Sequence, residues 1–305
     1  MTPLDLGSGQ CTLREAAQNF RGGPVITVVT RFAPSPTGRL HLGHAFSALS
    51  AFRFADRHGG RFLLRIEDID TGRCRPEFTD GILEDLVWLG LTWETPVRRQ
   101  SEHMEDYAAA LARLRAMEVV YPCFCTRADI AAAAAAPHGA QPLYPGTCRA
   151  LDAETRARRM AGPHAWRLDV GRAAALAVSR SVSRSGPLSW HDAARGEIAA
   201  MPEAEGDVVL ARKDAGTSYH LSVTVDDALQ GVTDVVRGED LFPATHIHRL
   251  LQALLGLRTP RYHHHALLTG PDGKRLAKRD RAETLAALRA RGVTPEAIKH
   301  QLGFA

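Results

Sequence analysis

The sequence has no uninterrupted apolar run approaching the ~18 residues that a membrane-spanning helix needs. Its N-terminus lacks the basic segment followed by an apolar one that is typical of a secretory signal. It contains five cysteines, an odd number, and without an export signal they argue against a framework of disulfides. These absences predict a cytoplasmic protein that has no membrane partner.

Several catalytic signatures are also absent. The sequence contains no G-x-x-x-x-G-K-[ST], no H-E-x-x-H and no G-x-S-x-G, which excludes several enzyme classes. Neither sign of charge dominates, because 38 Lys and Arg residues face 34 Asp and Glu residues, and the net charge of +4 permits an RNA partner without requiring one. Hydrophobic residues make up 45% and charged residues 24% of the 305 residues, as is ordinary for a globular enzyme.

The most informative stretch is residues 31–43, which read R-F-A-P-S-P-T-G-R-L-H-L-G and are followed by His44. Residues 24–30 before it predict a buried strand, and a helical pattern starts near His44. A strand, a turn and a helix in this order place backbone N–H groups and a positive helix end where an anion can bind. His41 and His44 would lie at that point and could donate hydrogen bonds to phosphate oxygens. Taken alone, such an H-x-x-H is more simply a pair of turn and cap residues.

The stretch resembles the signature of class I aminoacyl-tRNA synthetases, with Leu42 where isoleucine is more usual. Its flanks resemble the glutamyl type of that family rather than the glutaminyl type, where P-P-E-P-N-G is expected. A second stretch, G-K-R-L-A-K-R at residues 273–279, resembles the mobile lysine loop of the family and follows about 230 residues later, as the family requires. The resemblance covers residues 24–281. It implies an α/β fold, namely a Rossmann-like class I synthetase catalytic domain with an inserted zinc-containing subdomain.

The resemblance and the changes of composition along the chain predict five segments. They are an N-terminal extension (1–23), the first half of the Rossmann-like domain (24–118), the inserted acceptor and zinc subdomain (119–205), the second half with the lysine loop (206–281), and a short helical C-terminal tail (282–305). Only 26 residues follow the lysine loop. We therefore expect no helical anticodon-binding region of the kind that a full bacterial glutamyl-tRNA synthetase carries.

Periodicity predicts the main elements of these segments. We expect strands at 61–66, 207–210 and 222–225, and helices at 78–89, 103–117 and 245–255. Thr126 and Asp129 form a capping-box pattern that opens a helix over 131–136. Carboxylates follow the strand at 61–66, where an open α/β sheet binds its ligands. Of these, we interpret Asp68 and Asp70 as members of a solvated acidic turn.

Three cysteines lie within 26 residues, as Cys123-x-Cys125 and Tyr144-x-x-x-Cys148. Thiolates at this spacing suit one tetrahedral structural zinc, which favours sulfur and needs four protein ligands; three unlinked buried cysteines are the less favoured interpretation. His138 is intrinsically the better fourth ligand, because Tyr144 must lose a proton whose pKa is roughly 10. The pattern is nevertheless similar to the zinc module of glutamyl-Q tRNA(Asp) synthetases, which has a tyrosine there. The resemblance thus implies Cys123, Cys125, Tyr144 and Cys148 as ligands, with His138 as the alternative.

The resemblance also implies a pocket for L-glutamate. Arginine suits carboxylates because its planar fork makes paired charge-assisted hydrogen bonds, and Glu67 is the natural partner of the ammonium group. Which arginine binds the side-chain carboxylate stays open. The residues that match family positions near the amino acid are Arg31, Phe32, Ala33, Pro34, Ser35, Glu67, Tyr219 and Arg237.

The resemblance to this family also implies how ATP binds. His41, Gly43, His44 and Lys278 match nucleotide-binding positions, and His41, His44 and Lys278 would stabilise the charge of the reacting phosphates. Mg²⁺ is expected on those phosphates. A basic surface loop would be the simpler interpretation of the lysine loop on its own. Ala277 replaces the serine that is common in the family, which removes one hydroxyl donor.

Glutamyl-Q tRNA(Asp) synthetases are shortened relatives that activate glutamate with ATP and esterify it to the queuosine base of tRNA(Asp). The resemblance implies this ligase activity, with L-glutamate, ATP and queuosine-containing tRNA(Asp) as partners. A glutamate carboxylate oxygen would attack the α-phosphate and release pyrophosphate, and a hydroxyl of the tRNA would then attack the adenylate. Two alternatives stay open: a truncated glutamyl-tRNA synthetase that charges a tRNA 3′ end, and a non-catalytic paralogue that binds an amino acid or RNA.

Overall fold

The computed structural model describes residues 27–126, 128–129, 143–180, 187–268 and 283–304. The predicted N-terminal extension, the helix over 131–136, His138 and the lysine loop with Lys278 lie outside these ranges. Within the described ranges, none of the helices is long and apolar enough to cross a membrane.

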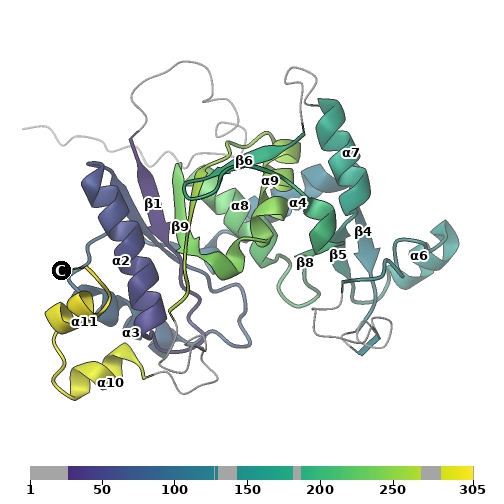
Figure 1. Ribbon diagram of the computed structural model, residues 1–305. Helices are drawn as coiled ribbons and strands as arrows, with labels where there is room; N and C mark the ends of the chain where they lie inside the picture. Colours follow the sequence, from purple (N-terminus) through teal and green to yellow (C-terminus); the bar gives the residue numbers. More distant parts are fainter. Residues whose placement is uncertain (1–26, 127, 130–142, 181–186, 269–282, 305) are drawn as a thin grey trace, which may run out of the picture.

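Two sheets of mainly parallel strands lie next to each other at the centre of the fold (Figure 1). The first has the order β1-β2-β3 and the second the order β7-β6-β10-β9, with only the β6–β7 hairpin antiparallel. Their strands are β1 (Val29–Phe32), β2 (Arg61–Ile66), β3 (Arg98–Arg99), β6 (Ser189–Asp192), β7 (Gly196–Ala199), β9 (Asp234–Gly238) and β10 (Arg261–His265).

Hydrogen bonds join the two sheets at the edge where β1 meets β9. The N–H of Val29 donates to Oγ1 of Thr233 at 2.8 Å, and the N–H of Thr233 donates to the carbonyl of Val29 at 3.0 Å. The strands therefore run in the order 3-2-1-9-10-6-7. The chain leaves β1 toward one side and β9 toward the other, and such a switch point is where open α/β sheets bind ligands.

Helices cover both faces of this sheet. Buried residues of α2, α3, α10 and α11 share one apolar cluster with β1 and β2, while α4, α7, α8 and α9 share another. The helices are α2 (Leu42–Arg57), α3 (Pro76–Trp88), α4 (Met104–Ala116), α7 (Val170–Arg180), α8 (Tyr219–Leu229), α9 (Ala244–Leu255), α10 (Leu285–Ala290) and α11 (Pro295–Gln301). Short 3₁₀ turns occupy Gln100–Glu102, Pro202–Glu205 and Glu239–Leu241.

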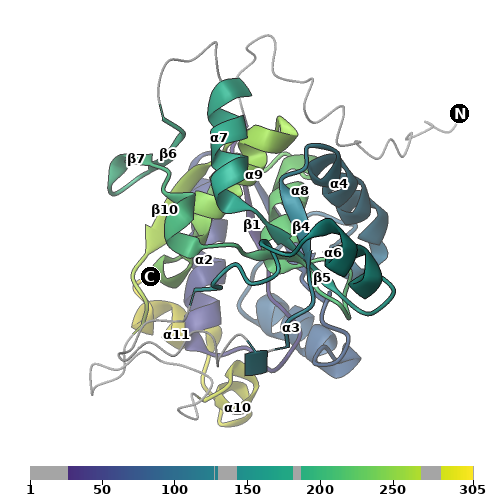
Figure 2. The same cartoon turned by 90° about the vertical axis from the view of Figure 1, so that its right-hand side faces the viewer.

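A third, antiparallel sheet, called the inserted sheet below, has two strands in the segment predicted as an insertion and a third just after it. It has the order β4-β5-β8, with β4 (Val120–Cys123), β5 (Ala165–Leu168) and β8 (Val209–Ala211), and α6 (Ala153–Arg159) lies near it. In Figure 2, β4, β5 and α6 face the viewer, while α2 and β1 lie behind them. The inserted sheet is thus set apart from the switch point.

Several predicted elements are confirmed. Strand β2 has the predicted bounds, and α3, α4 and α9 match the predicted helices to within a few residues. The capping box is also formed, because the N–H of Thr126 donates to Oδ2 of Asp129 at 2.6 Å and the N–H of Asp129 donates to Oγ1 of Thr126 at 3.1 Å. Strong hydrophobic periodicity and local cap chemistry therefore identified these elements correctly.

The prediction of a strand at 222–225 is wrong. These residues lie inside α8, where the alternation of Leu221, Val223 and Val225 with hydroxyl residues imitates a strand. The helix tolerates the hydroxyls because Ser222 and Thr224 donate to carbonyls one turn earlier, at 2.9 and 2.8 Å. All three apolar residues are buried, since neighbouring elements surround this helix.

Two other predicted strands are displaced. The strand expected at 207–210 is β8, at Val209–Ala211, and it pairs with β5 of the inserted sheet rather than with the central one. The strand expected at 24–30 is β1, which continues through Arg31 and Phe32. Arg31 is therefore a buried strand residue, and a charge in that position requires a buried partner.

Candidate active site

A cavity of about 550 Å³ opens at the carboxyl ends of β1 and β9, beside the N-terminus of α2. Most residues that were predicted to bind glutamate or ATP line it: Arg31, Phe32, Ala33, His41, Gly43, His44, Glu67, Tyr219 and Arg237. Two predicted glutamate residues, Pro34 and Ser35, are not among the described lining residues. The carbonyl of Pro34 instead accepts the N–H of Glu67 at 3.0 Å and so fixes the backbone of that residue.

His41 and His44 form the N-terminal cap of α2. The N–H of Gly43 donates to Nδ1 of His41 at 3.1 Å, and the N–H of His41 donates to Nδ1 of His44 at 3.2 Å. Because both Nδ1 atoms accept, a neutral ring of either histidine carries its proton on Nε2. The ring centroids of His41 and His44 lie 3.8 Å apart. A side chain on Gly43 would come within 3.0 Å of the His41 ring, so glycine suits this cap.

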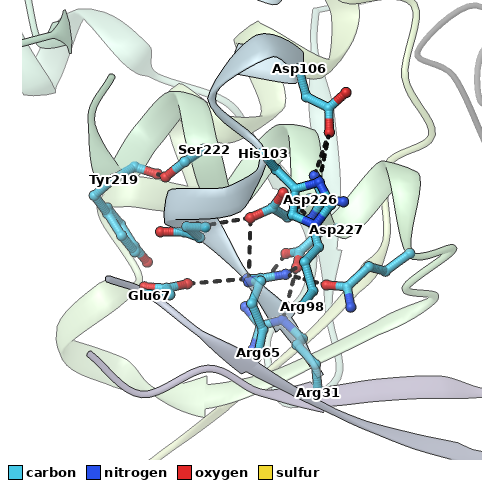
Figure 3. A network of polar contacts seen from close by, with 12 residues as sticks. Arg31, Arg65, Glu67, Arg98, His103, Asp106, Tyr219, Ser222, Asp226 and Asp227 are labelled. Carbon is cyan, nitrogen blue, oxygen red and sulfur yellow. Dashed lines mark hydrogen bonds and ion pairs between the residues drawn. The ribbon is translucent and has the colours of Figure 1, made fainter. Parts of the chain in front are cut away.

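The cavity wall contains an extended network of buried charges (Figure 3). Arg31 donates from Nε and Nη2 to the two oxygens of Asp227, at 3.1 and 3.4 Å. Burial disfavours the carboxylate of Asp227, but Arg31 and then Arg65 outweigh it and hold the pKa of Asp227 below its usual value. Arg31 lines the cavity, and its positive charge is balanced by the carboxylate of Asp227.

Glu67 follows β2 and is nine-tenths buried beside the same network. Nη2 of Arg65 donates to its Oε1 at 3.2 Å. Burial raises the pKa of Glu67, and the positive charges of Arg65 and then Arg31 oppose that rise. Asp68 and Asp70, the other carboxylates of the predicted acidic turn, have different partners. Asp68 accepts hydrogen bonds from Ser101, and Asp70 forms an ion pair with Arg212 at 2.9 Å.

Arg237 is held differently from Arg31. Its Nε donates to Nε2 of His264 at 3.2 Å, its Nη1 donates to the hydroxyl of Tyr219 at 3.2 Å, and its Nη2 donates to Oγ1 of Thr245 at 2.6 Å and to the carbonyl of Leu241 at 3.0 Å. Every one of these acceptors is uncharged. Burial and the charge of Arg237 lower the pKa of His264 to about 4, so that this ring is neutral at physiological pH. Arg237 therefore presents a less neutralised positive charge to the cavity than Arg31 does.

Several residues of this region were not predicted from the sequence. Ser47 and His265 line the cavity and contact each other, with Oγ and Nε2 3.0 Å apart, and Arg65, Asp226 and Asp227 form the network behind it. The sequence does contain a signal for a buried charge network: Arg65 interrupts an apolar strand, and Asp226 and Asp227 interrupt an apolar helix. Charges in such positions are buried only when they are paired.

A second cluster lies where β4 ends. The Sγ atoms of Cys123, Cys125 and Cys148 all lie within 4.8 Å of one another, and those of Cys125 and Cys148 are 3.5 Å apart. The hydroxyl of Tyr144 is 3.5 Å from Sγ of Cys123 and 3.6 Å from Sγ of Cys125. Zinc–sulfur bonds of about 2.3 Å place the corners of a tetrahedral site about 3.8 Å apart, so these donors fit a zinc ion after small movements.

Two of the three sulfurs have hydrogen-bond donors beside them. Nε of Arg167 lies 3.3 Å from Sγ of Cys123, and the N–H of Phe124 lies 3.4 Å from Sγ of Cys148. The guanidinium of Arg167 also stacks 3.8 Å above the ring of Tyr144. Such donors and cations stabilise negative charge on sulfur and fix the orientation of ligands.

The family model of class I tRNA synthetases (E and Q), catalytic domain, matches residues 27–304. A glutamyl-Q tRNA(Asp) synthetase of Rhodobacter capsulatus is 51% identical over 91% of this chain and 100% of its own length. Another protein of that name, from Symbiobacterium thermophilum, is 45% identical over 90% of this chain and 85% of its own length.

Among solved structures, the glutamate–tRNA synthetase of Elizabethkingia anophelis superposes with a TM-score of 0.76 at 28% identity, over 90% of this chain. This chain spans 61% of that structure. The predicted family and the predicted α/β fold class are confirmed. The chain therefore belongs to the class I tRNA synthetases of the glutamyl and glutaminyl group, and residues 27–304 match the catalytic domain of that family.

Proposed function

We propose that this protein activates L-glutamate with ATP and transfers it to the queuosine base in the anticodon loop of tRNA(Asp). One observation carries the activation step: the cavity places Arg31, Arg237 and Glu67 next to the histidine-capped N-terminus of α2. The relatives named glutamyl-Q tRNA(Asp) synthetase support the choice of acceptor. The cytoplasm, where ATP and tRNA are available, is the compartment we propose.

The charges of the cavity suit a dicarboxylic amino acid. Glutamate brings one ammonium group, which Glu67 can accept, and two carboxylates, which Arg31 and Arg237 can bind. Glutamine would place a neutral amide against one of these guanidinium groups and leave its charge without a counter-ion. We therefore propose that glutamate is preferred to glutamine.

The nucleotide would bind with its phosphates at the N-terminus of α2. The helix end and the Nε2–H groups of His41 and His44 can stabilise charge that develops on the α-phosphate when the carboxylate oxygen attacks and pyrophosphate leaves. No protein nucleophile is needed in this step, so the protein acts by positioning and electrostatics. Lys278, outside the described residues, is proposed as a further phosphate contact, and Mg²⁺ is proposed to arrive with ATP.

The chemistry of queuosine suits an acceptor, because its cyclopentene ring carries a vicinal diol like that of a terminal ribose. The proposed test uses tRNA(Asp) from which the 3′ CCA has been trimmed. If trimmed tRNA that contains queuosine still accepts glutamate and queuosine-free tRNA does not, the proposal stands. Loss of acceptance on trimming would favour the alternative, a glutamyl-tRNA synthetase that charges the 3′ end.

A non-catalytic binding protein is the remaining alternative. ATP–pyrophosphate exchange driven by glutamate separates it from an enzyme, because exchange requires formation and reversal of the adenylate. Equal exchange with glutamine would contradict the proposed specificity, and no exchange with either amino acid would contradict the proposed activity.

We also propose one structural zinc ion, held by Cys123, Cys125, Cys148 and Tyr144. The support is geometric: three sulfurs and one hydroxyl stand at distances close to the edges of a tetrahedral site. The ion would cross-link β4 to the segment around Cys148 and would supply no chemistry to the reaction.

A further inference from the structure

A chain of charges behind the cavity connects Arg31 to Glu67. Nη1 of Arg65 donates to Oδ1 of Asp227 at 2.8 Å, and its Nη2 donates to Oε1 of Glu67 at 3.2 Å (Figure 3). Asp227 accepts in turn from Arg31. Neither Arg65 nor Asp227 is among the described residues that line the cavity, and the side chain of Arg65 is 0% exposed. The two side chains can therefore act only through the residues that they hold.

One guanidinium group sets the geometry of this connection. The guanidinium of Arg65 is planar with donors in a fixed fork, so its two nitrogens hold Asp227 and Glu67 in a defined relative position. A flexible ammonium group could not do the same. Burial of such a cation is costly unless carboxylates surround it, and Asp226 supplies a third one 3.6 Å from Nε.

The same cation affects the charge of Glu67. A buried carboxyl group tends to hold its proton, and a protonated Glu67 could not pair with an ammonium ion. The charged or titratable groups that face Glu67 are Arg65 on β2, Arg31 on β1, and Asp226 and Tyr219 on α8. Asp227 of α8 pairs with both arginines. Only the two arginines in this set favour the ionised form.

We propose that Arg65, held by Asp227, is a positioning residue for the amino-acid substrate. It fixes the Glu67 carboxylate for the ammonium group and, through Asp227, the Arg31 guanidinium for a carboxylate. This inference rests on the proposed function, because glutamate is the molecule whose opposite charges these two side chains would meet. Arg65 itself touches no substrate.

A pH series distinguishes this role from simple structural support. Without the positive charge of Arg65, Glu67 should keep its proton to higher pH, and glutamate binding should recover only as the pH rises. The matched control is Arg98, whose Nε is 2.7 Å from Oδ1 of Asp226 and whose Nη2 is 2.6 Å from Oδ2 of Asp106. Arg98 belongs to the same network, but its ion pairs with described residues are to Asp106 and Asp226 and not to Glu67 or Asp227.

The experiment measures glutamate-driven ATP–pyrophosphate exchange for Arg65→Gln, Arg65→Lys and Arg98→Gln from about pH 6 to about pH 8.5. For Arg65→Gln we expect the KM for glutamate to rise at least about thirtyfold near neutral pH, as for the loss of one partner of a buried charge pair. The KM for ATP should change less than about twofold, since no phosphate contact is altered. The midpoint of the pH dependence should move upward in Arg65→Gln alone, and Arg65→Lys should restore it because the charge returns.

An equal loss of glutamate affinity in Arg65→Gln and Arg98→Gln, with the pH midpoint unmoved, would overturn the inference. Circular dichroism establishes that each variant folds; if Arg65→Gln does not, a KM for glutamate in Arg65→Lys equal to that of the wild-type protein overturns it as well. No exchange by the wild-type protein would contradict the proposed function instead. Calorimetric titration with L-glutamate, on the same variants and pH series, then decides the inference by itself.

Discussion

Nδ1 of His264 lies 2.7 Å from Oδ2 of Asp192, and both side chains are almost completely buried. On its other side, Nε2 of the same ring accepts a hydrogen bond from Nε of Arg237. Asp192 thus selects the tautomer in which Nδ1 carries the proton and Nε2 is free to accept. The pair holds Arg237 in place while adding no negative charge next to it.

His264 should make the protein less stable in mild acid. Its pKa is about 4 in the folded protein, against roughly 6.5 when unfolded, so unfolding takes up a proton between these values and stability falls as the pH drops below about 6.5. The loss from this ring should be roughly 2 kcal/mol between about pH 7 and about pH 5. Denaturant unfolding at both pH values measures it. His264→Gln should reduce the acid loss by that amount, whereas substitution of the exposed His191 should leave it unchanged.

Arg237→Gln should weaken glutamate binding by roughly 2 to 5 kcal/mol, because it removes a buried cation whose hydrogen-bond acceptors among the described residues are all uncharged. The preference for glutamate over glutamine should shrink at the same time. Exchange kinetics with both amino acids measure the two effects. Arg195→Gln is the control, since Arg195 is exposed and stacks on Phe242 outside the cavity lining. An unchanged preference in Arg237→Gln would contradict the assignment of a carboxylate to this arginine.

His44→Ala should lower kcat of the exchange reaction roughly 10²- to 10³-fold, as for loss of one donor to a developing negative charge. The KM for glutamate should change little, because the role proposed for His44 is at the phosphates of the nucleotide and not at the amino acid. His58→Ala controls for effects on the helix, since His58 caps the opposite, exposed end of α2. Similar losses in both variants would point to damage of the helix rather than to phosphate stabilisation.

Zinc should be present at about one equivalent per chain, and Cys125→Ser should lose it. We expect the thermal midpoint of that variant to fall by at least about 5 °C, because a structural metal contributes directly to folding. Cys74→Ser is the matched control, since Cys74 lies outside the cluster. Full stability in a metal-free preparation would refute the site. Retention of zinc by Tyr144→Phe together with its loss from His138→Ala would reassign the fourth ligand.

The sequence was informative where chemistry is local. The cap of α2 and the strand of Arg61–Ile66 follow from short patterns, and so does the spacing of the cysteines that the structure brings together. The helix at Tyr219–Leu229 was missed because hydroxyl residues satisfied by their own backbone imitate the alternation of a strand. Local pattern alone cannot show on how many sides an element is covered.

The partners within the site could not be predicted at all. Arg31 and Asp227 are 196 residues apart, and Arg65 and Asp227 are 162 residues apart. No periodicity connects such positions, so an unpaired charge in an apolar run shows only that some partner must exist. The lining of the cavity was found mainly through family motifs, whereas the network behind it became visible only in three dimensions.

Val29 and Thr233, which contact each other, are 204 residues apart. The cavity beside them can therefore be completed only late in the synthesis of the chain. A nascent chain that ends before β9 already contains Arg31 and Glu67, but it lacks Arg237 and the strand that lies against β1. The residues between Val29 and Thr233 must be synthesised before that strand can dock, and contacts across such a separation form slowly. We therefore expect glutamate, the substrate proposed above, to stabilise the finished domain but not a chain that ends before β9.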